Sequence, residues 1–374
     1  MNNLFSRLSQ RADVPLDPTG FPKVSIIGAS GKVARVTIET LFKMNTGLLN
    51  LALISRSPDR VEGIVLDARS TMSLPLQCQG KPPVLPRYDV TDNLDAVRDS
   101  KLVIVTAGSF LSVAEAEIFR KTDPTGRLSQ AYANYNMICD LTEKVGSLAP
   151  EALMIVVTNQ SDMMAAVARE HHPDPARVLG FGGMIDSARF RDHAKQLAMA
   201  KNPRALCPEI EGQMIGYHNM TQILLSSSFS HKVAFTEAET EQLVQDTRVT
   251  GARIAKLQRR ADYVSSETGA KLDTGASIMP GTALALCALA VAGQGRMLIE
   301  SFNTLLCSDT HADHYGVGIV TALSVPIELG PDGYSVSTDF MPTEQEKVAL
   351  REAVRNMNAD CKALRAVVKR PACV

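Results

Sequence analysis

Residues 23–42, KVSIIGASGKVARVTIETLF, contain the strand-to-helix transition that decides the fold. The run KVSIIGA is apolar and β-branched, as in a strand buried on both faces, and apolar residues then recur at helical spacing. Glycines at 28 and 31 permit a tight turn and a close backbone approach to phosphate, and the helix N-terminus that follows supplies amide donors. The alternative is an ordinary strand–helix turn. We predict a loop that binds the pyrophosphate of a dinucleotide through Gly28, Ala29, Ser30, Gly31, Lys32 and Val33.

Strand-like and helix-like segments alternate after this loop. Continuous apolar runs of strand length occur at 50–56, 101–108 and 152–159, and apolar residues recur at helical spacing after Arg127. This alternation predicts an α/β fold with a Rossmann-type doubly wound parallel sheet over 23–175, which binds ligands at the carboxyl ends of its strands. Residues 1–22 are expected to form an N-terminal arm.

The pattern changes after residue 175, where helical segments dominate. We expect helices at 186–201, 236–264, 280–303 and 343–368, and an antiparallel hairpin formed by 316–329 and 334–340 around a Gly-Pro-Asp-Gly turn. Residues 176–374 are therefore predicted to form an α+β domain that binds the substrate.

Composition excludes several classes of protein. The 374 residues carry a net charge of −1 with dispersed basic residues, which argues against a nucleic-acid partner. The longest apolar run, 283–293, is too short to span a membrane. Seven cysteines without a C-x-x-C motif argue against a disulfide scaffold or a zinc ribbon and favour reduced thiols in the cytoplasm. The acid-poor start leaves an organellar location as the alternative.

The end of the second strand carries the cofactor preference. It reads Ser55-Arg56-Ser57, with no acid before Asp59. A carboxylate there usually bonds the adenosine ribose of NAD, whereas hydroxyls and a guanidinium suit a 2′-phosphate. We therefore predict NADP rather than NAD. The alternative is that Arg56 lies along the adenine of NAD or points into solvent.

Two further segments suggest chemistry: MIDSARFR at 184–191 and IGYHN at 215–219. Asp186 and Arg189 are three residues apart at an expected helix start, so they share one face. A carboxylate there can orient a histidine and stabilise its charged form, and a guanidinium can hold a substrate carboxylate in a bidentate fork. The alternative for such a pair is a surface ion pair.

These segments together resemble the lactate/malate dehydrogenase family in order and spacing. The likeness rests on GASGKVA, VTAG (105–108), Arg127 with Asn134 seven residues later, VTN (157–159), IDSARFR (185–191) and IGYH (215–218). It implies a family-like C-terminal domain and an NAD(P)-dependent 2-hydroxy acid dehydrogenase acting on malate/oxaloacetate or lactate/pyruvate. It also implies a small anionic 2-keto or 2-hydroxy acid as partner, no metal, and a homodimer or homotetramer.

The resemblance implies roles for individual residues. His218 would exchange a proton with the substrate, and Asp186 would orient it. Arg189 would hold the C1 carboxylate, Arg127 would polarise the carbonyl from a closing loop, and Asn159 would contact both substrate and cofactor. The remaining cofactor contacts would come from Ser55, Arg56, Ser57, Thr106, Ala107, Gly108, Asn134 and Val157.

Several positions depart from the family pattern. Tyr217 precedes the histidine in place of glutamate, Asn219 and Met220 follow it in place of Gly-Asp, and Gln160 replaces a proline. The segment after VTAG is enlarged, and Arg120 is expected either to bind a distal substrate carboxylate or merely to cap a short helix. Tyr217 is the second candidate proton donor.

An alternative function is a catalytically silent family member that binds the dinucleotide as a sensor or subunit. Retention of the Arg127, Asp186, Arg189 and His218 residue types argues against that alternative. His311 and His314 are expected at the exposed end of a loop rather than on a metal.

Overall fold

The computed structural model describes residues 20–44, 49–73, 85–109, 111, 115, 119, 123, 127–202, 208–219, 221–231, 233–258, 276–295 and 297–368. Residues 1–19 of the expected arm, Arg120 and Met220 lie outside these ranges. No helix within the described ranges is long and apolar enough to cross a membrane.

A nine-stranded sheet forms the centre of the molecule, in the order β11-β10-β9-β6-β5-β4-β1-β2-β3. Six neighbouring strands run parallel: β3, β2, β1, β4, β5 and β6. The order 3-2-1-4-5-6 is that of a doubly wound dinucleotide-binding sheet. The predicted α/β fold class is therefore confirmed. The bounds are β1 (Lys23–Ile27), β2 (Asn50–Ile54), β3 (Arg87–Thr91), β4 (Ser100–Val105), β5 (Leu153–Val156), β6 (Val178–Gly180), β9 (Leu298–Leu306), β10 (Thr321–Gly330) and β11 (Gly333–Val336).

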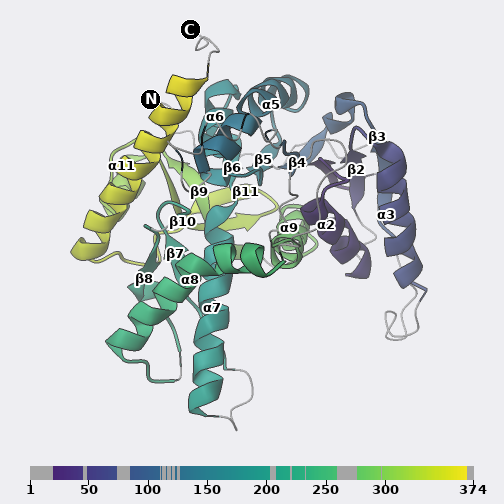
Figure 1. Cartoon of the computed structure of the whole chain (residues 1–374). Coiled ribbons are helices and arrows are strands. Elements are labelled where there is room, and N and C mark those ends of the chain that lie inside the picture. Colours follow the sequence, from purple (N-terminus) through teal and green to yellow (C-terminus); the bar gives the residue numbers. More distant parts are fainter. Residues whose placement is uncertain are drawn as a thin grey trace.

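Helices cover both faces of this sheet. Figure 1 shows α5 and α6 on one side, with α11 beside them, and α2 and α9 together on the other. Their bounds are α2 (Lys32–Lys43), α3 (Pro58–Thr71), α5 (Arg127–Leu148), α6 (Ser161–His171), α7 (Gly182–Lys201), α8 (Glu237–Gln258), α9 (Ile278–Val291), α10 (Asp309–Tyr315) and α11 (Glu344–Val367). A small antiparallel pair, β7 (Gln213–Ile215) and β8 (Ile223–Leu225), lies beside α7.

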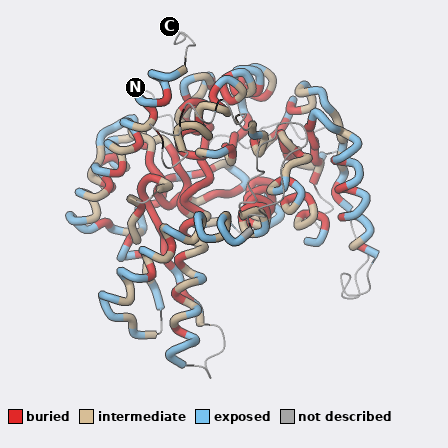
Figure 2. Tube along the Cα trace, viewed as in Figure 1, coloured by how far each residue is buried: buried red, intermediate tan, exposed pale blue. Residues whose placement is uncertain are grey.

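The core follows the parallel strands and the inner helix faces (Figure 2). All four residues of β5 are buried, as expected for a strand covered on both sides. Helix α9 is buried almost all round, and Gly281 lets it approach α2 closely. A Cβ at this glycine would lie 2.5 Å from the Cβ of Val36. The helix that starts after the predicted phosphate loop is therefore held firmly against the second half of the chain.

The structure corrects two expected helices. The helix expected over 280–303 ends at Val291, where Gly293 takes a left-handed φ of 73°, and the chain continues as strand β9. Helical spacing was the wrong interpretation because β9 finds β10 and β6 as partners. Helix α7 begins at Gly182 rather than at 186. The sequence did not predict this start because glycine is a poor helix former, and Gly182 and Gly183 instead let the first turn pack closely against His218 and Ser301.

Other expectations for the second half hold. The hairpin around Gly-Pro-Asp-Gly is confirmed as β10 and β11. The helix expected over 236–264 is confirmed as far as Gln258, and 259–264 lies outside the described residues. The sheet continues across residue 175, because β6 pairs with both β5 and β9. The division into two domains at that residue stays a prediction.

Candidate active site

The glycine-rich loop ends β1 in a turn that only glycine fits. Gly28 has a φ of 89°, and a Cβ there would lie 2.5 Å from the backbone nitrogen of Ala107. The amides of Gly28 and Ala29 both donate to the Ile54 carbonyl, at 2.9 and 3.1 Å. Helix α2 then begins with neither a side-chain cap nor an acidic residue in its first turn. Its N-terminus is therefore suited to a phosphate group.

The end of β2 lies against this loop. Ser55 is buried, donates to the hydroxyl of Ser30 at 2.9 Å, and accepts the Ser57 amide at 3.1 Å. Arg56 is exposed next to them. The structure thus places Ser55, Arg56 and Ser57, which are predicted to contact the adenosine side of the cofactor, beside the phosphate loop.

The VTAG segment extends the same edge of the sheet. The hydroxyl of Thr106 donates to the Ile27 carbonyl at 3.0 Å, which ties the end of β4 to the end of β1. Thr158 in turn donates to the carbonyl of Ala107 at 2.6 Å. The loops that follow β1, β4 and β5 therefore meet, and Thr106, Ala107, Gly108 and Val157 lie where a dinucleotide would cross a doubly wound sheet.

Asn134, on α5, links the β4 and β5 loops. Its Oδ1 accepts the Ser109 amide at 2.7 Å, and its Nδ2 donates to the Asn159 carbonyl at 3.0 Å. The peptide bond between Asn159 and Gln160 is cis, and Gln160 donates from its Nε2 to Gln130 at 2.9 Å. Asn159 is thus placed at the same edge as the phosphate loop.

The two segments predicted to carry the reaction, 184–191 and 215–219, contact each other in the structure. Nδ1 of His218 lies 2.5 Å from Oδ2 of Asp186, a carboxylate that is almost fully buried. Arg189 places Nη1 3.5 Å from the other oxygen of the same carboxylate. An aspartate on Nδ1 fixes the histidine tautomer and leaves Nε2 for proton exchange. Burial lowers the pKa of Arg189, and the nearby charge of Asp186 opposes that shift. The guanidinium remains a cation well above neutral pH.

Gln222 adds a contact that the sequence did not reveal. When the amide nitrogen of Gln222 faces Asp186, it donates to Oδ2 of that residue and to the Asn219 carbonyl, both at 2.9 Å. Arg248 on α8 fixes the Gln222 backbone by donating twice to its carbonyl, at 2.6 and 2.9 Å. The buried Gln222 therefore helps to orient the carboxylate that holds the histidine.

Backbone geometry brings His218 to Asp186. Gly216 follows β7 with a φ of 107° and exchanges two backbone hydrogen bonds with Ser324 of β10, at 2.9 and 3.0 Å. The histidine ring then rests on the first residue of α7. A Cβ at Gly182 would lie 2.5 Å from both Cβ and Cγ of His218. The missing side chain of Gly182 is therefore what makes room for the ring.

Arg127 and Tyr217 surround the backbone of the histidine. Arg127 begins α5 and donates from Nη2 to the His218 carbonyl at 3.0 Å, with its guanidinium 5.3 Å from the centre of the Tyr217 ring. The buried Tyr217 hydroxyl donates to Asp360 of α11 at 2.8 Å. Burial raises the pKa of Tyr217 far above its usual value of 10.0. A hydroxyl in that state is a poor second proton donor.

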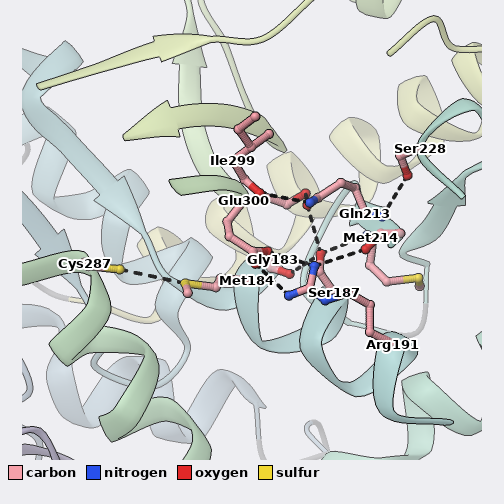
Figure 3. A network of polar contacts seen from close by, with 12 residues as sticks. Gly183, Met184, Ser187, Arg191, Gln213, Met214, Ser228, Cys287, Ile299 and Glu300 are labelled. Carbon is pink, nitrogen blue, oxygen red and sulfur yellow. Dashed lines mark hydrogen bonds and ion pairs between the residues drawn. The ribbon is translucent and has the colours of Figure 1, made fainter. Parts of the chain in front are cut away.

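A polar network under α7 supports the helix that carries Asp186 (Figure 3). Gln213 lies at its centre, accepting from Ser187 at 3.3 Å and donating to the Ile299 carbonyl at 3.1 Å. Arg191 pairs with Glu300 through two contacts of 2.6 and 3.2 Å. Burial raises the pKa of Glu300, and the Arg191 charge opposes that rise. The network holds α7 against β7 and β9.

Sequence reasoning missed Gln213, Gln222 and Glu300 because their partners lie between 26 and 109 residues away. It also missed Asp162, which accepts the His218 amide at 2.9 Å. A signal for Asp162 existed, because it is an acid directly before the apolar residues 163–168 and three residues after Asn159.

The histidines at 311 and 314 lie on α10, and Nε2 of His314 lies 2.8 Å from the Phe340 carbonyl. Within the described ranges, no three His, Cys, Asp or Glu side chains gather in a way that could hold a metal ion. The expectation of no metal stays untested.

Comparison with known proteins gives a consistent result. The profile described as "lactate/malate dehydrogenase, NAD binding domain" matches residues 22–180. A malate dehydrogenase of Helicobacter hepaticus is 25% identical over 92% of this chain and 98% of its own length. L-lactate dehydrogenase A of Hordeum vulgare is 26% identical over 91% and 87%. The structure of Cryptosporidium parvum lactate dehydrogenase with lactic acid and nicotinamide adenine dinucleotide covers 94% of this chain and 99% of its own, with 21% identity and a TM-score of 0.72.

Proposed function

The chain belongs to the lactate/malate dehydrogenase family, and we propose that it transfers a hydride between a nicotinamide dinucleotide and a small 2-hydroxy or 2-keto acid. The observation that carries the proposal is the 2.5 Å contact between His218 and Asp186, with Arg189 on the same carboxylate. This cluster contains a proton-exchanging group and a carboxylate-binding group, which are the two groups that the reaction requires.

The cofactor fits residues of this chain. Gly28 removes the side chain that would block a close approach, and the uncapped start of α2 offers amide donors to a pyrophosphate. When bound, the nicotinamide supplies a hydride to the C2 carbon of the keto acid or accepts one from the hydroxy acid. Asn134 and Asn159 would hold the loops after β4 and β5 around it.

The residues of the chain handle the proton and the charges. In the reducing direction, protonated His218 gives its Nε2 proton to the carbonyl oxygen while Asp186 stays bonded to Nδ1. In the oxidising direction, neutral His218 takes the hydroxyl proton. Arg189 binds the C1 carboxylate of the substrate with two parallel hydrogen bonds, and the positive charge of Arg127 stabilises the developing oxyanion.

The finer preferences belong to the same proposal. NADP is favoured over NAD by the Ser55-Arg56-Ser57 end of β2, which lacks an acid. Arg120 is proposed to bind the distal carboxylate of a dicarboxylic acid. We further propose a dinucleotide-binding part over 23–175, a substrate-binding part over 176–374, a homodimeric or homotetrameric state and a cytoplasmic location.

The test is a panel of 2-keto acids, including pyruvate and oxaloacetate, with NADH and with NADPH. The full chain should oxidise one cofactor with at least one acid. His218→Asn should lower kcat by about 10²–10⁴-fold through loss of the general acid, with an unchanged Kd for the dinucleotide. His314→Asn is the matched control, because that histidine bonds the Phe340 backbone instead, and it should keep full activity.

Absence of turnover with every acid and both cofactors would contradict the proposal. If the inactive chain still gained thermal stability from a dinucleotide, the silent sensor or subunit would be the better interpretation.

A further inference from the structure

The catalytic histidine is held at its backbone as well as at its ring. The His218 amide donates to Oδ2 of Asp162 at 2.9 Å, and its carbonyl accepts from Nη2 of Arg127 at 3.0 Å. Together with Asp186 on Nδ1, three charged side chains from α6, α5 and α7 hold one residue. No sequence motif assigned the contact with Asp162.

Asp162 is an unusual residue for its position. It is 1% exposed and is followed in α6 by the buried apolar residues Met163, Met164 and Ala165. Burial raises its pKa, whereas His218 and Arg127 lower it. Its second oxygen is buried and has no hydrogen-bond partner among the described residues. A buried carboxylate is unfavourable for folding unless its contacts compensate, and the His218 amide is the hydrogen-bond donor that the structure gives it, beside the charges of His218 and Arg127.

The histidine segment needs such a contact because the sheet does not hold it. The last backbone bridge of this segment is at Gly216, which pairs with Ser324 and has a φ that few other residues adopt. Beyond that glycine, the His218 amide and carbonyl meet side chains instead of a neighbouring strand. The direction of the imidazole therefore depends on Asp162 and Arg127.

We propose that Asp162 is a positioning residue for the reaction: it fixes the His218 backbone so that Nε2 faces the substrate carbonyl. Asp162 lies three residues after Asn159, whose carbonyl accepts a hydrogen bond from Asn134 of α5. It therefore also couples the position of the histidine to the end of β5, where the nicotinamide would lie. This inference rests on the proposed function.

The test compares Asp162→Ala with Asp162→Asn in the full chain. The alanine leaves the His218 amide without its acceptor, whereas the asparagine offers a carbonyl oxygen in the same place. Asp162→Ala should lower kcat by about 10²-fold, the loss expected when a reacting group shifts by about 1 Å. The KM for the keto acid should change by less than about threefold, because Arg189 is untouched, and Asp162→Asn should recover kcat to within about tenfold of the wild type.

Val167→Ala is the matched control. Val167 is a buried residue of the same helix, and its truncation perturbs α6 without touching His218. Turnover is expressed per dinucleotide-binding site, counted by NADH fluorescence titration, so that a loss of folded protein does not count as a loss of kcat. The control should keep its kcat per site.

A second measurement does not depend on activity. In protein labelled with [15N]histidine, the His218 amide is the resonance absent from His218→Asn, and seven histidines keep the spectrum simple. Its hydrogen exchange should be at least about tenfold faster in Asp162→Ala than in the wild type and nearly unchanged in Asp162→Asn. This result would stand even if the wild type turned over no acid, in which case only the proposed function fails.

Three results would overturn the inference. The first is unchanged amide exchange in Asp162→Ala, and the second is a kcat per site for that variant within threefold of the wild type. Equal impairment of the alanine and asparagine variants would also overturn it, because the hydrogen bond would then not be what matters.

Discussion

Gly182→Ala gives the sharpest test of the position of the histidine. Gly182 is the first residue of α7, and a Cβ there would lie 2.5 Å from Cβ and Cγ of His218 and 3.0 Å from its Cδ2. Its backbone is not in the left-handed region, so alanine introduces no backbone strain and is the better helix former. The three atoms nearest to the added Cβ all belong to His218, so the expected penalty is a collision with that side chain.

The size of the effect follows from this distance. Ordinary contacts begin near 3.4 Å, so the histidine must retreat by about 0.9 Å from a Cβ at 2.5 Å. Misplacing a reacting group by about 1 Å costs roughly 10²-fold in rate, or about 2.7 kcal/mol of transition-state stabilisation. The retreat also stretches the 2.5 Å contact with Asp186 and the 2.9 Å bond to Asp162.

The assay measures kcat and kcat/KM for the best keto acid of the panel, together with Kd for the dinucleotide. Both kinetic constants should fall about 10²-fold, and Kd should stay unchanged, because Gly182 follows β6, which β5 and β4 separate from β1 and its phosphate loop. Gly63→Ala is the control. Gly63 lies within α3 with nothing within 4 Å of a built Cβ, and alanine should stabilise it by roughly 0.5–1 kcal/mol.

A Gly182→Ala enzyme with kcat/KM within threefold of the wild type would refute the reasoning, because the ring position would then not limit the chemistry. A loss confined to Kd would refute it as well.

Three further predictions concern the cofactor and stability. Gly28→Ala should weaken NADH binding more than tenfold in calorimetry, because its Cβ would meet the Ala107 backbone at 2.5 Å; intact binding would contradict the loop assignment. Arg56→Asp should shift the ratio of kcat/KM values from NADPH towards NADH, and an unchanged ratio would remove its 2′-phosphate role. Burial raises the pKa of Asp162 above its ordinary 3.8, so the carboxyl ionises more readily in the unfolded chain and the wild type loses stability as pH rises above that value. Asp162→Asn should lose less stability over the same range. Equal losses of unfolding free energy in the two proteins between pH 4 and 7, measured by denaturation, would contradict this.

The features that depend on near neighbours in the chain were predictable. The glycine loop of 28–31 requires only a buried strand before it and an amphipathic helix after it, and both patterns are local. Asp186 and Arg189 share a face because they are three residues apart in α7. Their pairing with His218, 32 residues from Asp186, came from the family resemblance and is confirmed as a contact by the structure.

Short and exposed strands escaped prediction for a physical reason. β3 is only partly buried, so its sequence RYDVT lacks an apolar run, and β6 has three residues. Strand β9 was predicted as a helix because a short apolar segment fits either structure when its neighbours in space are unknown. Its partner strand β10 is brought beside it only by folding. Arg120, expected at the substrate, lies outside the described residues, so its role stays a prediction.

The sequence by itself determined the strand–helix alternation that begins at β1, the phosphate loop and the residue types needed for proton exchange and anion binding, because these depend on spacing along the chain. Only the tertiary structure decided that Asp162 and Arg127 hold the His218 backbone, that Gln222 shares Asp186, and that Gly182 makes room for the ring. Those contacts join residues between 36 and 91 positions apart, where the folded backbone and not the local pattern sets the distance.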